Sequence, residues 1–257
     1  MGEAIASSPG AERGEAAPLS GNGRGERLWR ALWNMYKHPV LRRGNATDSN
    51  SGQLLVGEKA FSQAAERYRS IRSSLVTSTI PGGVHSFVMV CAQAGEGASS
   101  CAANLAIAFS QLRSSTLLVD ANLRDSNIGQ LFGYDRRQAG LSDLLQEGGT
   151  NAAEFLLQPQ PSLHLLTAGS LTPNPLELLS SEAFAHLVEH FDHDYDVVIY
   201  DTAAALEHSD AFVVARQVGA GILIVRKNVS KFSDVDDIVK QLRAMHCPIV
   251  GSILSGG

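Results

Sequence analysis

Six short, continuous runs of β-branched and other apolar residues constrain the fold of this chain more than any other feature. A continuous run, rather than an alternating one, is typical of a strand that is buried on both faces of its sheet. Strands that alternate with helices form a parallel sheet covered on both sides, so the sequence predicts an α/β three-layer sandwich. The runs cover residues 85–92, 115–121, 163–169, 195–202, 221–227 and 248–254. Helical patterns cover residues 59–78, 99–112, 175–190, 210–218 and 233–245.

The chain before this alternation divides into segments of different composition. Residues 1–26 lack hydrophobic periodicity, and we expect them to be disordered. Residues 27–43 predict a helix with an aromatic face and five positive charges, which favours an anionic membrane surface or a partner. Packing of this helix on its own domain is the alternative. We expect a linker at 44–57 and the α/β domain at 58–257.

Charge and cysteine content exclude several classes of function. A net charge of −5 offers no basic field, so we expect no nucleic-acid partner. The three cysteines, Cys91, Cys101 and Cys247, do not have the spacing of a zinc site. The sequence has no signal-peptide pattern and no apolar run of membrane-spanning length. We therefore expect a cytoplasmic protein, peripheral on the inner face of the plasma membrane if residues 27–43 bind lipid.

The stretch CAQAGEGASSCAANLA, residues 91–106, predicts a phosphate-binding loop at the end of the first strand. A glycine-rich turn lets backbone N–H groups converge at the N-terminus of the next helix, where the helix dipole favours an anion. A turn built only for packing is the alternative for this stretch alone. The expected nucleotide-binding residues are Ala94, Gly95, Glu96, Gly97, Ala98, Ser99 and Ser100.

Two aspartates at the ends of predicted strands strengthen the nucleotide interpretation. Asp120 closes the run TLLVD, and Asp201 closes the run YDVVIYD. Carboxylates at the tips of parallel strands, beside a hydroxyl in the loop, are typical ligands of Mg²⁺. We therefore expect Ser99, Asp120 and Asp201 to form a metal site, and the two aspartates to be catalytic if the protein is active.

In this order and spacing, the motifs resemble those of the bacterial tyrosine kinases (BY-kinases), over roughly residues 58 to 256. The segments AQAGEGASSCAANLAIAFSQ, TLLVDANLRDSNIGQLFG and YDVVIYDTAAAL are similar to that family's Walker A, Walker A′ and Walker B motifs. The connecting segments GLSDLLQEG and LTAGSLTPNPLELL are similar as well. The resemblance implies a P-loop NTPase-like fold of the MinD/BY-kinase type that binds ATP or ADP with Mg²⁺. It also implies a membrane polysaccharide co-polymerase of the chain-length determinant type as partner.

A charged pattern upstream of the loop extends the resemblance. Glu66, Arg69 and Arg72 form an ExxRxxR pattern whose spacing places all three on one helical face. In the family such a helix docks into the neighbouring subunit, which implies self-association into a ring or dimer. A solvated charged face is the alternative.

Several positions depart from the family pattern. Ala98 replaces the Walker A lysine, Asn122 replaces the second acid of Walker A′, and DTAA replaces DTPP after the Walker B strand. Gln93 stands where MinD- and ParA-type ATPases carry a further lysine. No lysine lies near the loop in the sequence, and Lys227, at the end of a strand that we expect to be distant from the loop, is the candidate considered for a substitute cation. The five tyrosines are scattered, so we expect no tyrosine-rich autophosphorylation tail. These departures predict weakened ATP, ADP and Mg²⁺ binding.

Three functional hypotheses are consistent with these residues. The favoured one is a catalytically degenerate BY-kinase-like protein that acts as an assembly or regulatory subunit in exopolysaccharide polymerisation and export. The second is a divergent, active tyrosine autokinase or slow ATPase. The third is a MinD/ParA-like positioning protein.

Overall fold

The computed structural model describes residues 54, 62–77, 86–136 and 138–256. The predicted tail at 1–26, the predicted helix at 27–43 and, apart from Leu54, the predicted linker at 44–57 lie outside the described residues. Those segment boundaries, and the start of the α/β domain at 58, stay predictions.

Within the described residues, seven strands form one sheet in the order β3-β4-β2-β5-β1-β6-β7. All neighbouring strands are parallel except β3, which pairs antiparallel with β4. The strands are β1 Ser86–Cys91, β2 Thr116–Asp120, β3 Leu157–Gln160, β4 Leu163–Leu166, β5 Val197–Asp201, β6 Gly221–Arg226 and β7 Ile249–Ser255. Every residue of β1, β2 and β5 is buried, which confirms that continuous apolar runs mark strands covered on both faces.

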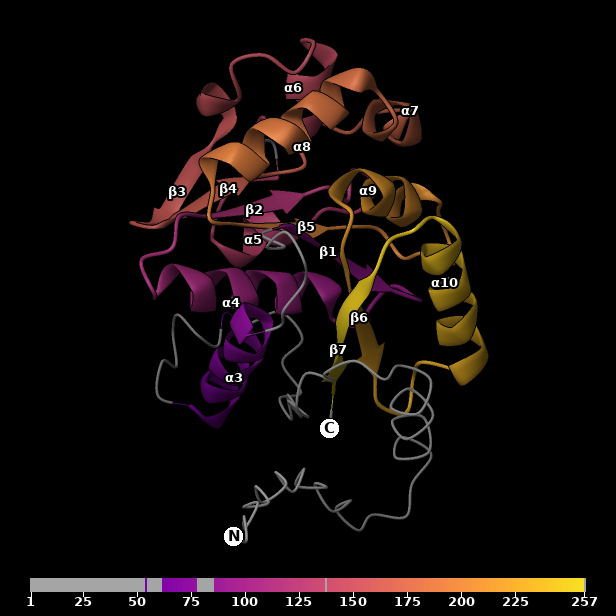
Figure 1. Cartoon of the computed structure of the whole chain (residues 1–257). Coiled ribbons are helices and arrows are strands. Elements are labelled where there is room, and N and C mark those ends of the chain that lie inside the picture. The colour runs from indigo at the N-terminus through magenta and orange to yellow at the C-terminus, as the bar shows by residue number, and fades with distance from the viewer. Residues whose placement is uncertain (1–53, 55–61, 78–85, 137, 257) are drawn as a thin grey trace, which may run out of the picture.

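Helices cover both faces of the sheet, which confirms the three-layer α/β sandwich (Figure 1). On one face lie α3 Gln63–Thr77, α4 Ala98–Ser110 and α5 Ile128–Leu131, whose apolar residues pack in one core cluster. On the other face lie α6 Leu141–Gln146, α7 Pro175–Leu179, α8 Glu182–Asp194, α9 Asp210–Val218 and α10 Phe232–Ala244. A 3₁₀ turn, η1 Ala152–Phe155, precedes β3.

The structure differs from the predicted elements at several places. The short helices α5 and α6 and the turn η1 were not predicted. The helix expected at 175–190 is two helices, because the Ser181 side chain accepts a hydrogen bond from the Phe184 N–H (3.2 Å) and so begins α8 as an N-cap. The strand β3 was not predicted, because LQPQ has no apolar run and includes a proline. Proline is tolerated there because β3 lies at the edge of the sheet.

The register of the strands brings their carboxyl ends to one edge of the sheet. Asp120 and Asp201 are direct partners at the ends of β2 and β5. The glycine loop follows β1, which lies between β5 and β6. No helix among the described residues is long and apolar enough to cross a membrane.

Candidate nucleotide site

The turn between β1 and α4 has the backbone geometry of a phosphate-binding loop. Gly95 (φ 79°) and Gly97 (φ 92°) both adopt the left-handed conformation, which side-chain-bearing residues rarely adopt. A Cβ atom at Gly95 would meet nothing within 4 Å, so conformation rather than space requires glycine there. Gly97 is the N-cap of α4 and has no side chain to cap the first N–H groups of the helix. These N–H groups therefore remain available for an anion.

Hydrogen bonds to the buried residue Glu96 stabilise the turn. Its side chain is only 1% exposed. One carboxylate oxygen accepts a hydrogen bond from the Ala92 N–H (2.8 Å), and the other accepts one from the Ser230 hydroxyl. The Ser255 hydroxyl donates to the Glu96 carbonyl (2.6 Å). The Glu96 side chain is therefore part of the loop's support.

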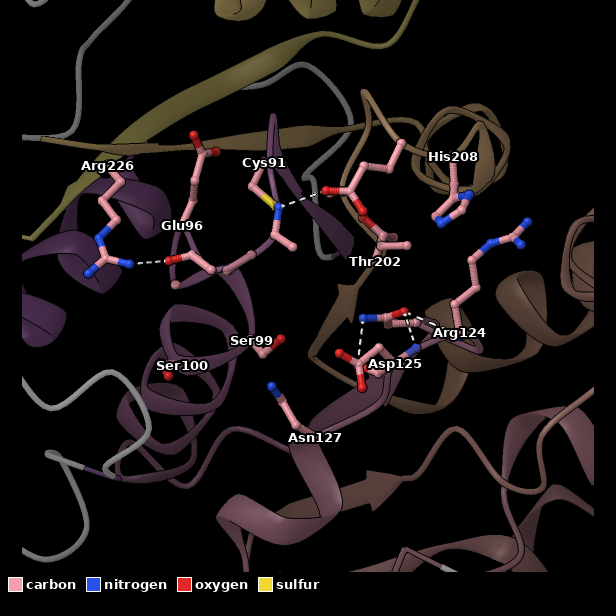
Figure 2. A pocket seen from close by; sticks show the side chains of 18 of the residues that line it. Cys91, Glu96, Ser99, Ser100, Arg124, Asp125, Asn127, Thr202, His208 and Arg226 are labelled. Atoms are coloured by element: carbon pink, nitrogen blue, oxygen red, sulfur yellow. Dashed lines mark hydrogen bonds between the residues drawn. The ribbon is translucent and has the colours of Figure 1, made fainter. Parts of the chain in front are cut away.

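A pocket of about 330 Å³ opens above the loop (Figure 2). All seven predicted nucleotide-binding residues, 94–100, line it. Ala98 is the first residue of α4 and is 6% exposed, so its methyl group offers no charge to a phosphate. The pocket residues contributed by the rest of the chain are Cys91, Asn122, Arg124, Asp125, Asn127, Leu131, Thr202, Ala203, Ala204, Glu207, His208 and Arg226.

Asp120 and Asp201 lie beneath the pocket rather than on its surface. Both are completely buried, while Asn122 and Thr202 line the pocket above them. Asp120 accepts hydrogen bonds from the Asn122 N–H (3.1 Å), the Ser126 hydroxyl (2.6 Å) and the Ile128 N–H (3.3 Å). Burial outweighs these bonds and raises the pKa of Asp120 to about 6.

Asp201 is an unusual buried carboxylate. Neither of its side-chain oxygens has a hydrogen-bond partner of normal geometry among the described residues. Burial, and then the charge of Asp120, raises its pKa well above the usual value, while the nearby Ser99 hydroxyl lowers it only partly. A buried carboxylate without a partner is costly, and a cation beside Ser99 would relieve that cost. No cluster of three or more His, Cys, Asp or Glu suited to a metal occurs in the described residues.

Four charged residues at the pocket were missed by the sequence interpretation: Arg124, Asp125, Glu207 and Arg226. Arg124 forms a two-contact ion pair with the completely buried Asp210 (2.6 and 3.0 Å). Glu207 accepts a hydrogen bond from the Ala94 N–H (3.3 Å), so a carboxylate competes for one loop donor. Arg226 donates to the Gly95 carbonyl. Arg226 ends an apolar strand, and the same signal that singled out Asp201 could have identified it.

Lys227, considered as a substitute cation, is exposed and does not line the pocket. The expectation that its strand is distant from the loop is wrong, because β6 pairs directly with β1. The strand is near the loop, but Arg226 is the residue that faces it.

The ExxRxxR residues lie on α3, against the last turn of α4. The Arg72 guanidinium donates to the Ala108 carbonyl, near the C-terminus of α4. Arg69 pairs with Glu66 (3.2 Å) and donates to the Gln111 side chain (3.3 Å). Glu66 remains 68% exposed. Arg72 thus has a role within the domain, and self-association through this helix stays a prediction.

Comparison with known proteins identifies relatives of this chain among the tyrosine-protein kinases of bacteria. No family model matches the chain. The chain is 29% identical over 192 residues to the tyrosine-protein kinase YwqD of Bacillus subtilis (strain 168), covering 75% of this chain and 81% of YwqD. It is 28% identical to the putative tyrosine-protein kinase CapB of Staphylococcus aureus, covering 80% and 90%. It is 30% identical to the tyrosine-protein kinase wzc of Salmonella typhi, covering 79% of this chain but only 28% of wzc.

The solved structures that resemble this chain include a kinase domain of the same kind. The chimerical protein CapA2B2 matches with a TM-score of 0.79 at 29% identity, covering 88% of this chain and 97% of that one. The VpsO kinase domain matches with a TM-score of 0.68 at 30% identity, covering 78% and 98%. MinD of Pyrococcus horikoshii OT3, in complex with Mg-ADP, matches with a TM-score of 0.57 at 21% identity, covering 66% and 69%, and is similar in fold alone.

Proposed function

Because the chain belongs to the bacterial tyrosine kinase family, we propose that it is a member that keeps a nucleotide pocket but has lost efficient phosphoryl transfer. The observation that carries the proposal is the Ala98 methyl group at the start of α4, within a loop otherwise suited to phosphate. We propose that the protein acts as an assembly or regulatory subunit in exopolysaccharide polymerisation and export.

Retained binding is supported by the backbone of the loop. The glycine turn and the uncapped N-terminus of α4 present N–H groups to the pocket, and these need no lysine. A single lost charge contact with phosphate is worth roughly 2 to 4 kcal/mol, which weakens binding without necessarily abolishing it. ATP or ADP is therefore the proposed ligand.

The buried carboxylates fit Mg²⁺ as the companion of that nucleotide. Ser99 and Asp201 are the proposed direct or water-mediated ligands, with Asp120 beside them. The unpartnered oxygens of Asp201 are the feature that a cation would satisfy. When bound, Mg²⁺ would neutralise charge on the phosphates.

Two features support the loss of efficient transfer. Without the lysine, stabilisation of charge in the transition state should fall by on the order of 10² to 10⁴ in rate. Asn122 is occupied in a local turn, because its side chain accepts from the Arg124 and Asp125 N–H groups (3.3 and 3.1 Å) and donates to the Asp125 carbonyl (3.0 Å). An amide used in this way cannot act as the base or the metal ligand that an acid could provide.

Partners and assembly are proposed from the family. A membrane co-polymerase is the proposed partner, and Glu66, Arg69 and Arg72 are proposed to mediate a ring or dimer. Residues 27–43 are proposed to bind that partner or the inner face of the plasma membrane. The chain spans 28% of the length of wzc.

An active tyrosine kinase or slow ATPase is the second candidate. Asp201 favours it, because a buried carboxylate with a raised pKa is a stronger base in its ionised form, and neither of its oxygens has a hydrogen-bond partner of normal geometry in the described residues. A MinD-like positioning role has weaker support, since that similarity concerns the fold alone.

Turnover assays separate these functions. We expect the native protein to bind Mg·ATP, to release no phosphate above buffer and to gain no phosphotyrosine, whereas Ala98→Lys should bind more tightly. Asp201→Asn is the control for contaminating activity. Phosphate release by the native protein that disappears in Asp201→Asn would overturn the proposal in favour of an enzyme.

A further inference from the structure

Arg226 occupies a position from which it can reach a ligand in the pocket. It is the last residue of β6, which pairs with β1 on one side and β7 on the other. Because β1 leads directly into the glycine turn, the end of β6 is next to that turn. Figure 2 shows Arg226 and Arg124 on opposite sides of the pocket, with Ser99 between them.

Hydrogen bonds tie the end of β6 to the loop. The Arg226 N–H donates to the Ser230 hydroxyl (2.7 Å), and that hydroxyl donates to the buried carboxylate of Glu96. Ser255, the register partner of Arg226 on β7, donates to the Glu96 carbonyl (2.6 Å). The backbone of Arg226 is therefore held in a fixed relation to the turn at Glu96.

The guanidinium group lies against the turn itself. One of its terminal nitrogens donates to the Gly95 carbonyl. The side chain runs along Gly256, where a Cβ atom would come within 3.3 Å of the Arg226 Cγ. Within the described residues Arg226 forms no ion pair, and its remaining guanidinium N–H groups have no hydrogen-bond partner. A guanidinium has five N–H donors, so one bond to Gly95 leaves donors for a phosphate.

The other arginine of the pocket is already neutralised. Arg124 makes two contacts with the carboxylate of Asp210, whose side chain is fully buried, and this pairing raises the pKa of Arg124. No lysine is among the residues that line the pocket. Of the two lining arginines, Arg226 is therefore the one that forms no ion pair with an acid in the described residues.

We propose that Arg226 supplies the positive charge for the phosphates of a nucleoside di- or triphosphate in place of the lysine that is absent at position 98. The inference rests on the proposed function, because it requires that the pocket binds nucleotide. It deepens that function by naming the residue that makes binding possible without a loop lysine. Arginine suits this task because its planar group can contact two phosphate oxygens at once.

The test is calorimetric titration of Mg·ADP and Mg·ATP into the full chain, with the variants Arg226→Ala and Lys227→Ala. Lys227→Ala is the matched control, because it removes the same charge one residue away, at an exposed position outside the pocket. We expect Arg226→Ala to weaken binding by roughly 10- to 100-fold, and Lys227→Ala by less than about threefold. Circular dichroism of each variant establishes that it is folded.

A second pair of variants tests whether Arg226 takes the place of the missing lysine. These variants are Ala98→Lys and Ala98→Lys/Arg226→Ala. A lysine at position 98 should make Arg226 less necessary, so the loss caused by Arg226→Ala should shrink to a few-fold in that background. An equal loss in both backgrounds, or equal effects of Arg226→Ala and Lys227→Ala, would overturn the inference while leaving nucleotide binding intact. If the native protein shows no binding at millimolar nucleotide and Ala98→Lys binds, retained nucleotide binding itself fails and this inference fails with it.

Discussion

Asp120 and Asp201 are direct register partners at the ends of β2 and β5, and both side chains are completely buried. Asp120 is compensated by three hydrogen bonds, whereas Asp201 has none of normal geometry in the described part of the chain. Two buried carboxylates side by side disfavour ionisation of both. The pair therefore links the stability of the protein to pH and to the presence of a cation.

The first prediction concerns that pH dependence. The folded protein holds the protons of this pair more tightly than the unfolded chain does, because the pKa of Asp120 is raised to about 6 and that of Asp201 is raised further above its usual value. The free energy of unfolding should fall as pH rises from about 4 through 6, and for Asp201 beyond it.

Urea unfolding of the native protein and of Asp201→Asn at pH 5 and pH 8, without Mg²⁺, measures this effect. Asp201→Asn should be more stable than the native protein at pH 8 and should lose less stability between the two pH values. Glu189→Gln, at an exposed position on α8, is the control and should behave like the native protein. Parallel pH profiles for the native protein and Asp201→Asn would contradict the prediction.

The second prediction concerns Glu207, whose carboxylate accepts from the Ala94 N–H at the mouth of the loop. Glu207→Gln should tighten Mg·ADP binding about threefold, because it removes a negative charge near the proposed phosphates while keeping an acceptor for Ala94. The effect should decrease as salt rises. Calorimetry beside Glu189→Gln, an exposed glutamate on α8, provides the comparison. Weaker binding by Glu207→Gln would mean that Glu207 helps to hold the nucleotide.

The third prediction concerns the ion pair between Arg124 and the buried Asp210. Arg124→Ala should lower the free energy of unfolding by about 3 to 5 kcal/mol, since it leaves a buried carboxylate without a partner. The double variant Arg124→Ala/Asp210→Asn should recover a large part of that loss. Urea unfolding of both variants checks the prediction, and a loss below about 1 kcal/mol for Arg124→Ala would show that Asp210 is rehydrated at little cost.

The fourth prediction separates the two roles proposed for α3. Arg72→Ala should destabilise the domain by about 1 to 3 kcal/mol, because the Ala108 carbonyl at the end of α4 loses a charged donor. Glu66→Ala should leave stability within about 0.5 kcal/mol, because this side chain is 68% exposed, but should reduce self-association. Urea unfolding and sedimentation velocity measure the two effects. A Glu66→Ala variant that sediments like the native protein at every concentration would argue against docking through this residue.

Much of the fold could be predicted from patterns that depend on nearby residues. The helix at 210–218 begins and ends as predicted, and the six predicted strands are all present with ends shifted by a few residues. The split at Ser181 was missed because apolar periodicity continues across it, and only the hydrogen bond to Phe184 interrupts the helix. The edge strand β3 was missed because its pairing with β4, rather than its own residues, makes it a strand.

The sequence alone determined that a glycine turn follows a buried strand, that aspartates end two other strands and that no lysine stands at position 98. These features depend on residues close together in the chain, where backbone conformation and burial follow local chemistry. Only the tertiary structure decided the order of the strands. That order places β6 beside β1, and therefore Arg226 against Gly95, although 131 positions separate these residues. It also pairs Asp120 with Asp201 beneath the pocket, because the contacts between distant strands depend on how the whole sheet packs.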